Sequence, residues 1–139
     1  MRVLGLDVGD RRIGIAMSDS LGLTAQRLSL LERETQAEDI ETIGGLLTKY
    51  DVEAIVIGLP ITLAGKHGAQ AQRVMAFARA LSKRVGTPVK FVDERLTTVQ
   101  GERALIETGT SRRKRKHLLD QVAAQLILQQ FLDAQRAKE

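Results

Sequence analysis

Three acidic residues lie in stretches of the sequence that otherwise predict buried structure. Asp7 is inside the apolar segment "VLGLDV", Glu94 follows the apolar pair at 91–92 and Asp93, and Asp120 precedes an apolar helical stretch. Burying an unpaired carboxylate is costly unless an arginine, a hydrogen-bond network or a cation compensates for it. Three such acids on three separate elements favour a cation. Taken singly, each also has a plain structural explanation: a turn acid for Asp7, a helix cap for Glu94 and a salt-bridge partner for Asp120.

These acids offer carboxylate oxygen atoms as ligands. The chain has no cysteine, so no thiolate ligand is available. Carboxylate oxygens suit Mg²⁺ or Mn²⁺ better than zinc. Two such ions about 4 Å apart can activate water and stabilise the leaving oxygen of a phosphodiester. We therefore expect metal-dependent cleavage of a phosphodiester, with Asp7 bridging the metals and substrate completing their coordination. The paired Arg11 and Arg12 would then lie near the substrate backbone.

The residues around Asp7 are small enough to leave room for such a site. A strand has a two-residue period, so Val3, Gly5 and Asp7 share one face, and the larger Leu4, Leu6 and Val8 share the other. The next apolar segment places two small residues, Gly14 and Ala16, together on one of its faces. Space beside an acid indicates a site.

The helix that carries Asp120 is the most informative about direction. Its residues at i+3, i+4, i+7 and i+11 are all apolar, which predicts that Asp120 faces the protein; they are Ala123, Ala124, Ile127 and Phe131. His117 is three residues before Asp120 and shares its face. It is therefore a candidate fourth metal-site group, with the alternative that it merely ends the preceding basic run.

The elements that must position these groups follow from periodicity and turn signals. Apolar runs at 2–8, 12–18 and 22–32 predict three antiparallel strands, with "GDRR" as the first turn. Thr35 and Glu38 form a capping box before a helix, and further strands are predicted at 53–60 and 89–94. Helices are predicted at 69–85 and at roughly 98–108 and 114–136, with Gly109 and the basic run between the last two. The expected fold is a single α/β domain over 1–139: a five-stranded mixed sheet with helices on both faces.

Positive charge is concentrated at one place. The run Arg112–Lys116 contributes five charges, whereas the formal net charge of the chain is only +4, so the remainder is close to neutral. Such a run indicates an anionic partner, with a solvated loop as the plain alternative. The expected nucleic-acid contacts are Arg11, Arg12, Lys66, Arg112, Arg113, Lys114, Arg115 and Lys116. Aromatic residues are sparse, with no Trp, one Tyr and three Phe, so recognition should depend on backbone charge and shape.

The N-terminal residues show neither a signal-peptide layout nor an apolar run long enough to span a bilayer. Together with the lack of cysteine, this predicts a cytoplasmic protein without a membrane partner.

Four segments resemble the YqgF family, which comprises RuvX-like pre-16S rRNA nucleases and Holliday-junction-resolvase homologues. They are "LGLDVGDRRIGIAMSD", "IVIGLP", "VDERLTT" and "SRRKRKHLLDQVAAQLILQQFL", and the resemblance covers essentially the whole chain. It implies an RNase H-like fold with Asp7, Glu94 and Asp120 as the catalytic acids. Where the family commonly has a basic or aliphatic residue, this chain has His117.

The resemblance favours cleavage in the 5'-end maturation of precursor 16S rRNA during ribosome biogenesis. Two alternatives remain open: a Holliday-junction resolvase acting on branched DNA, and a non-catalytic RNA-binding assembly factor, which would not need three converging acids. A sugar-kinase-like or actin-like ATPase also begins with such a strand, but needs two lobes of this fold, for which 139 residues do not suffice. Both a monomer and a homodimer fit these readings.

Overall fold

A computed structural model describes residues 2–60, 68–94, 109 and 111–138, and for residues 112, 113 and 115–121 it describes the backbone only. The elements in chain order are β1 Arg2–Val8, β2 Arg12–Ser18, β3 Ala25–Glu32, α1 Gln36–Lys49, β4 Val52–Leu59, α2 Ala69–Arg84, β5 Val89–Asp93 and α4 Arg112–Ala137. The expected helix at 98–108 lies outside the described residues.

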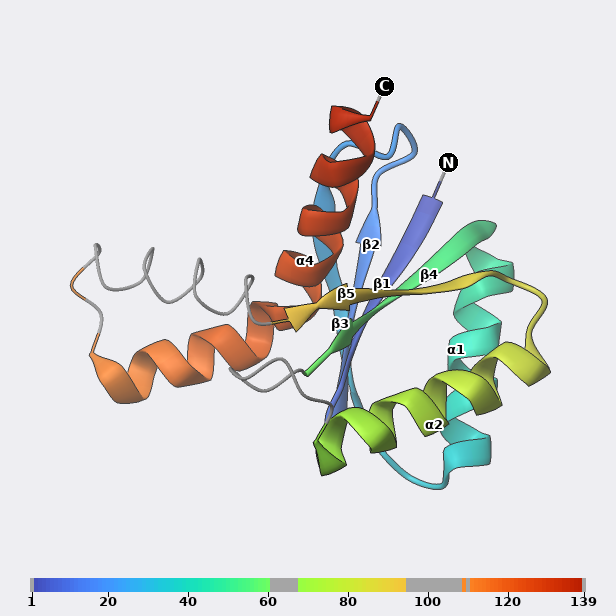
Figure 1. The fold of residues 1–139 in the computed structure, drawn as a ribbon, viewed down its shortest axis with the longest axis horizontal. Coiled ribbons are helices and arrows are strands. Elements are labelled where there is room, and N and C mark those ends of the chain that lie inside the picture. The colour runs from blue at the N-terminus through green and yellow to red at the C-terminus, as the bar shows by residue number, and fades with distance from the viewer. Residues whose placement is uncertain (1, 61–67, 95–108, 110, 139) are drawn as a thin grey trace.

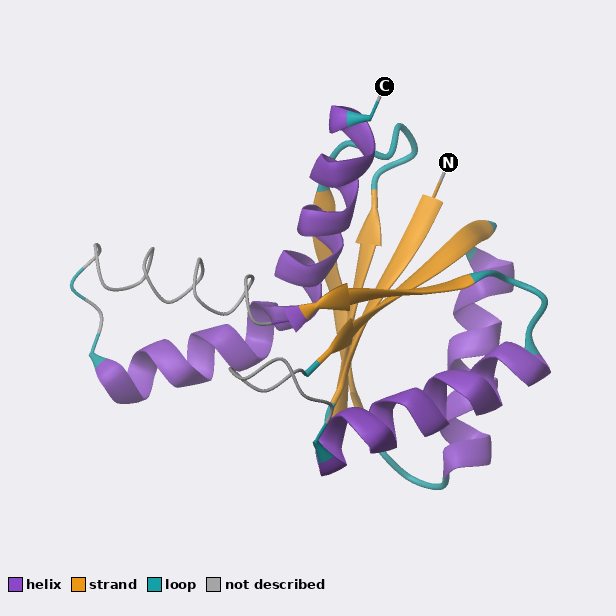
Figure 2. Ribbon diagram, viewed as in Figure 1, coloured by secondary structure: helices purple, strands orange, loops and turns teal. Residues whose placement is uncertain are grey.

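The five strands form one mixed sheet in the order β3-β2-β1-β4-β5 (Figure 2). β1 pairs antiparallel with β2, β2 pairs antiparallel with β3, and β4 is parallel to both β1 and β5. This confirms the expected α/β fold with a mixed sheet. Because β1, β4 and β5 are parallel, their carboxyl ends meet at the same edge of the sheet.

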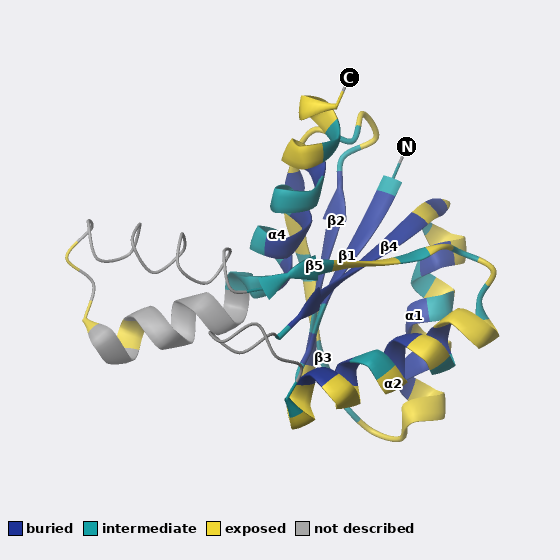
Figure 3. Ribbon diagram, viewed as in Figure 1, coloured by how far each residue is buried: buried dark blue, intermediate teal, exposed yellow. Residues whose placement is uncertain are grey.

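The two faces of the sheet are covered by different helices: α1 and α2 pack on one, and α4 on the other (Figure 1). The larger core cluster lies on the α1 and α2 face and includes Leu4, Leu6, Ile13, Ile15 and Phe77. The smaller cluster lies under α4 and includes Val3, Ala16, Val56, Ile127 and Leu128. The predicted alternation along the first two strands is confirmed, and Figure 3 shows buried residues filling the central strands.

Local capping signals explain where the helices begin. Thr35 caps α1: its hydroxyl accepts a hydrogen bond from the Glu38 backbone N–H at 3.1 Å, as the capping box predicts. The Glu38 carboxylate accepts from the Thr35 hydroxyl at 3.1 Å, whereas in a complete capping box it would accept from the Thr35 N–H. Ser111 caps α4 by accepting from the Lys114 N–H at 3.3 Å. The last helix therefore begins earlier than the predicted residue 114, at Arg112, and it includes the whole basic run expected between the last two helices.

The third strand begins later than expected, at Ala25 and not at residue 22. The Asp19 carboxylate accepts the N–H groups of Leu23 and Thr24 at 2.7 and 3.2 Å, which holds these residues in a turn. These bonds lower the pKa of Asp19. Gly22 has a φ of 71°, a left-handed conformation that favours glycine, so the turn is built into this sequence.

The long helix α4 has two parts with different surroundings. Its first part extends away from the sheet, and its second part runs along the sheet (Figure 1). Two glutamines of the second part bind backbone at the start of β3: Gln125 donates to the Ala25 carbonyl at 3.1 Å, and Gln129 accepts from the Ala25 N–H at 2.9 Å. The second part of α4 is therefore attached to the sheet by hydrogen bonds as well as by apolar contact. No described helix combines the length and apolar composition that spanning a bilayer requires.

Candidate active site

The structure brings Asp7 and Glu94 together at the carboxyl ends of β1 and β5. Both side chains are half-buried, and they are joined by a side-chain hydrogen bond. Burial raises the pKa of Glu94 to about 8, and the neighbouring charge of Asp7 and the hydrogen bond to Asp7 add to this shift. Two adjacent carboxylates cannot both ionise cheaply, so at neutral pH the metal-free pair keeps one proton, largely on Glu94.

Glycines on both neighbouring strands leave the space around this pair. Gly14 is the β2 partner of Asp7, and a Cβ built on it would lie 3.6 Å from the Asp7 Cβ and 3.5 Å from the Ala124 Cβ. On β4, a Cβ built on Gly58 would lie 2.4 Å from Ile127 Cδ1 and 3.6 Å from Glu94 Cδ. A side chain at position 58 would therefore require Ile127 of α4 to move, and it would lie in ordinary van der Waals contact with Glu94.

Sequence reasoning missed Gly58. The available signal was a glycine inside the buried run "IVIGLP", because an interior glycine in a strand often marks a place where other groups approach closely.

The backbone of Asp120 lies in α4, one helical turn before Ala124, and Ala124 packs over Gly14 beside Asp7. For Asp120 and His117 the structure describes only the backbone. Within the described part of the chain, no group of three or more His, Asp or Glu side chains is arranged to hold a metal ion. The structure thus assembles two of the three predicted acids and leaves the convergence of the third as a prediction.

The donor set of the described pair fits a hard divalent cation. Asp7 and Glu94 present carboxylate oxygens only, which is the chemistry preferred by Mg²⁺ and Mn²⁺. Burial, and then the adjacent Asp7, raise the pKa of Glu94 to about 8. A bound cation would favour the ionised form of both acids.

The turn after β1 carries the predicted Arg11 and Arg12. The Gly9 N–H donates to the Arg12 carbonyl at 2.9 Å, which closes the predicted turn. Arg12 pairs with Glu32 of β3 at 3.0 Å, and Asp10 pairs with Arg73 of α2 at 3.1 Å, both as exposed ion pairs. Arg11 is exposed and takes part in none of the ion pairs found between described side chains.

The other predicted basic groups are only partly described. Arg112, Arg113, Lys114, Arg115 and Lys116 occupy the first turns of α4, in the part that extends away from the sheet, and Lys114 is exposed. Lys66 lies outside the described residues. The structure therefore places the basic run on a projecting helix.

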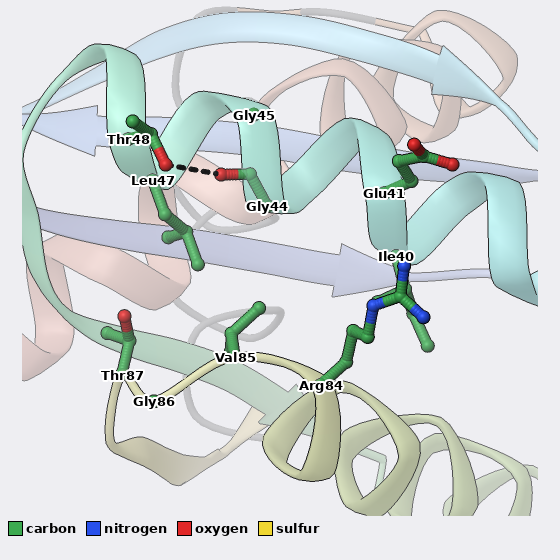
Figure 4. A pocket seen from close by; sticks show the side chains of 10 residues that line it. All are labelled: Ile40, Glu41, Gly44, Gly45, Leu47, Thr48, Arg84, Val85, Gly86 and Thr87. Carbon is green, nitrogen blue, oxygen red and sulfur yellow. Dashed lines mark hydrogen bonds between the residues drawn. The ribbon is translucent and has the colours of Figure 1, made fainter.

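A groove of about 560 Å³ lies elsewhere, between α1 and the connection from α2 to β5 (Figure 4). Its lining includes Gly44, Gly45 and Thr48 of α1 and Gly86 and Thr87, which precede β5. These residues lie at the amino ends of β4 and β5, away from the edge where Asp7 and Glu94 meet. With Glu41 as its one carboxylate, the groove offers no second acidic pair.

The sheet order and the acidic pair define an RNase H-like fold of the resolvase type. RuvC from Thermus thermophilus, solved in complex with a Holliday junction substrate, superposes with a TM-score of 0.63 at 17% identity, covering 99% of this chain and 96% of that one. The Holliday junction resolvase of fowlpox virus superposes with a TM-score of 0.53 at 13% identity, covering 96% and 99%. At such low identity these likenesses concern the fold alone.

The chain belongs to the RuvX family, because the family model described as "RuvX: Holliday junction resolvase" matches residues 1–134. Two relatives named "Putative pre-16S rRNA nuclease" are each 51% identical to it. The one from Halothermothrix orenii aligns over 97% of this chain and 96% of its own length, and the one from Moorella thermoacetica over 96% and 95%. By its family the chain is an enzyme, a phosphodiester hydrolase.

Proposed function

We propose that this protein is a divalent-metal-dependent nuclease that acts in the 5'-end maturation of precursor 16S rRNA. The observation that carries the proposal is the Asp7–Glu94 pair, with Glu94 held at a pKa of about 8 where the parallel strands end. The substrate follows from the names of the relatives that are 51% identical over almost the whole chain. The proposal treats residues 1–139 as one nuclease domain.

In this proposal Asp7, Glu94 and Asp120 hold one or two Mg²⁺ or Mn²⁺ ions, with His117 as a candidate fourth ligand. When bound, such a cation supplies the positive charge that activates water and offsets negative charge developing at the phosphate. Cation binding releases the proton from Glu94, so metal affinity should rise with pH up to about 8. Ligand sets this small bind Mg²⁺ weakly without substrate phosphates.

The basic residues bind the substrate backbone. Arg11 and Arg12 follow β1, which carries Asp7, and the Arg112–Lys116 run, together with Lys66 in the connection before α2, would extend this contact. Neutralising phosphates with Lys and Arg releases counterions, so binding should weaken steeply with salt. We expect little reading of base identity, because aromatic residues are sparse.

A second candidate is cleavage of branched DNA. It is favoured because the matched family model is described as a Holliday junction resolvase. The fold is also shared with a RuvC that was solved with a Holliday junction substrate. A non-catalytic RNA-binding role is the third candidate and predicts no dependence on the acids.

The test is a cleavage assay of pure protein on precursor 16S rRNA and on four-way DNA junctions, with Mg²⁺, with Mn²⁺ and with chelator. We expect the rRNA precursor to be cleaved with either metal and not with chelator, and Asp7→Asn to be inactive. Preferential cleavage of the junction would favour the second candidate. Tight RNA binding without cleavage under any condition would favour the third.

The third acid is tested by Asp120→Asn, which keeps the shape and removes the charge. If Asp120 holds metal, activity should fall by orders of magnitude while the fold persists, and Mn²⁺ should raise the Tm less than it does in the wild type. If Asp120 instead neutralises a buried arginine, the variant should lose about 3–5 kcal/mol of stability without metal, and this result would contradict its catalytic assignment.

A further inference from the structure

Arg33, between β3 and α1, joins the start of α1 to the turn that follows β1. Its Nε donates to Asp39 Oδ2 at 3.1 Å, and its Nη1 donates to the Gly9 carbonyl at 3.0 Å. Its backbone N–H donates to the Arg11 carbonyl at 2.9 Å. The guanidinium also lies over the Phe77 ring of α2, 5.1 Å from the ring centre. One residue therefore binds two carbonyl groups of the same turn.

Asp39 holds Arg33 in this orientation. Its side chain is only 2% exposed, and its second oxygen accepts the Glu34 N–H at 3.0 Å. Burying an ion pair is often no better for stability than apolar residues of the same volume, because both charges must be dehydrated. The Arg33–Asp39 pair thus contributes a fixed position for the guanidinium more clearly than it contributes net stability.

The turn that Arg33 binds connects the acidic pair to the proposed substrate contacts. Gly9 is two residues after Asp7, and the turn carries Arg11 with its side chain exposed. Two further side-chain contacts of this turn, Asp10 with Arg73 and Arg12 with Glu32, lie between exposed groups and are weakened by solvent screening. Arg33 is better buried than the arginines of these two pairs, with 20% of its side chain exposed against 56% for Arg73 and 59% for Arg12.

We propose that Arg33, oriented by Asp39, is a positioning residue that fixes the Gly9–Arg12 turn so that Arg11 meets the phosphate backbone of bound substrate. This inference rests on the proposed nuclease function. An arginine suits the task because its planar fork donates along two directions at once, to Asp39 and to Gly9. A lysine can serve one acceptor well but cannot reproduce the fork.

The first experiment measures KM and kcat on the substrate that the wild type cleaves, for Arg33→Met, Arg33→Lys and Asp39→Asn. Methionine keeps an unbranched stem that can pack against Phe77 but removes both donors. We expect Arg33→Met to raise KM roughly tenfold, which corresponds to 1.4 kcal/mol, with kcat changed far less. Arg33→Lys should recover part of the loss. Arg79→Met is the matched control, because it removes the same charge from an exposed position on α2 and should leave KM unchanged.

The second experiment asks whether Arg33 acts through Arg11. In that case the double variant Arg11→Met/Arg33→Met should have the KM of Arg11→Met alone, because the two changes remove one shared interaction. Amide exchange of Gly9 and Arg33 should also accelerate in Arg33→Met, since their N–H groups close the turn and its contact with the loop before α1.

The outcomes separate this inference from the function on which it rests. Wild-type KM in a folded Arg33→Met protein, or additive effects of the Arg11 and Arg33 changes, would overturn the inference alone. If Arg33→Met does not fold, wild-type KM in both Arg33→Lys and Asp39→Asn would overturn it equally. Wild-type protein that neither cleaves nor binds rRNA precursor or junction would contradict the proposed function and this inference together.

Discussion

The two faces of β1 show how one strand serves two purposes. On the α1 and α2 side it presents Leu4, Leu6 and Val8, all buried in the larger core cluster. On the α4 side it presents Val3, Gly5 and Asp7. There α4 approaches so closely that a Cβ on Gly5 would lie 2.8 Å from the Leu128 Cβ. Large side chains fill the first face of β1. The second face, which we call the shallow face, leaves little space between the strand and α4.

This difference shows where in the fold the chain can place groups whose burial is unfavourable. The filled face supplies apolar burial, the dominant favourable term in folding. The shallow face can then accommodate a pair of half-buried carboxylates, in which burial and, after it, the neighbouring Asp7 raise the pKa of Glu94. We infer that stability resides mainly on the α1 and α2 side and chemistry on the α4 side.

Substitutions of two neighbouring residues, one on each face, should differ most strongly in their effects on activity and stability. Asp7→Asn should reduce cleavage by more than about 100-fold, because changes even to the outer partners of metal ligands cost 10–100-fold. Its metal-free Tm should stay equal or rise, since a charge beside Glu94 is removed. Leu6→Ala should instead cost about 2–5 kcal/mol of unfolding free energy with activity per folded molecule retained. The checks are thermal melts and cleavage assays on the same preparations.

The comparison would be wrong if Asp7→Asn were strongly destabilised in the absence of metal. That result would make Asp7 a structural ion-pair partner and not a member of a repelling pair.

Glu94 on the shallow face should make the stability of the metal-free protein depend on pH. Glu94 keeps its proton up to about pH 8 in the folded protein and loses it near its ordinary value of 4.5 when unfolded. Between these values the folded state binds more protons, so stability falls as pH rises, by at most about 1.4 kcal/mol per unit. Chemical denaturation from pH 5 to 9 should show this decline levelling off above pH 8.

Two variants test whether Glu94 causes the decline of stability with rising pH. Glu94→Gln should lose the decline, whereas Leu6→Ala should be less stable at every pH with the decline unchanged. An identical pH profile in wild type and Glu94→Gln would remove the acidic pair as its source.

A pair of glycine substitutions sharpens the contrast between the faces. Gly58→Ala, on the α4 side, would place a Cβ 2.4 Å from Ile127 Cδ1 and should cost about 1–3 kcal/mol, because Ile127 must move. Gly45→Ala in α1 meets nothing within 4 Å and should stabilise the helix by about 0.5–1 kcal/mol. Thermal melts measure whether each variant gains or loses stability. An equal change in Tm at the two positions would contradict the close approach of α4.

The smallest effect is expected from the projecting part of α4. Replacing Arg113, Lys114, Arg115 and Lys116 by alanine should weaken nucleic-acid binding about tenfold and flatten its salt dependence, because fewer counterions are released. Stability should change little, since alanine favours the helix. Lys83→Ala/Arg84→Ala, at the exposed end of α2, is the control on the other side. A salt slope equal to that of the wild type would move the binding surface towards Arg11.

The sequence by itself determined the alternation of the strands, the capping box at Thr35 and the acids that break apolar patterns. These are local signals, because the periods of strands and helices and the chemistry of caps act over a few residues. They sufficed to predict the mixed sheet and to single out Asp7 and Glu94. Local signals also have limits: they predict the last helix from residue 114, although Ser111 caps it and it includes the whole basic run from Arg112.

Only the tertiary structure decided which of these residues meet. The proton shared by Asp7 and Glu94, the approach of Ile127 to Gly58 and the hold of Arg33 on the Gly9 carbonyl all join segments far apart in the chain. Each depends on the order of the strands and on how the helices and loops pack against the sheet. These follow from the simultaneous packing of all elements, which no local period encodes.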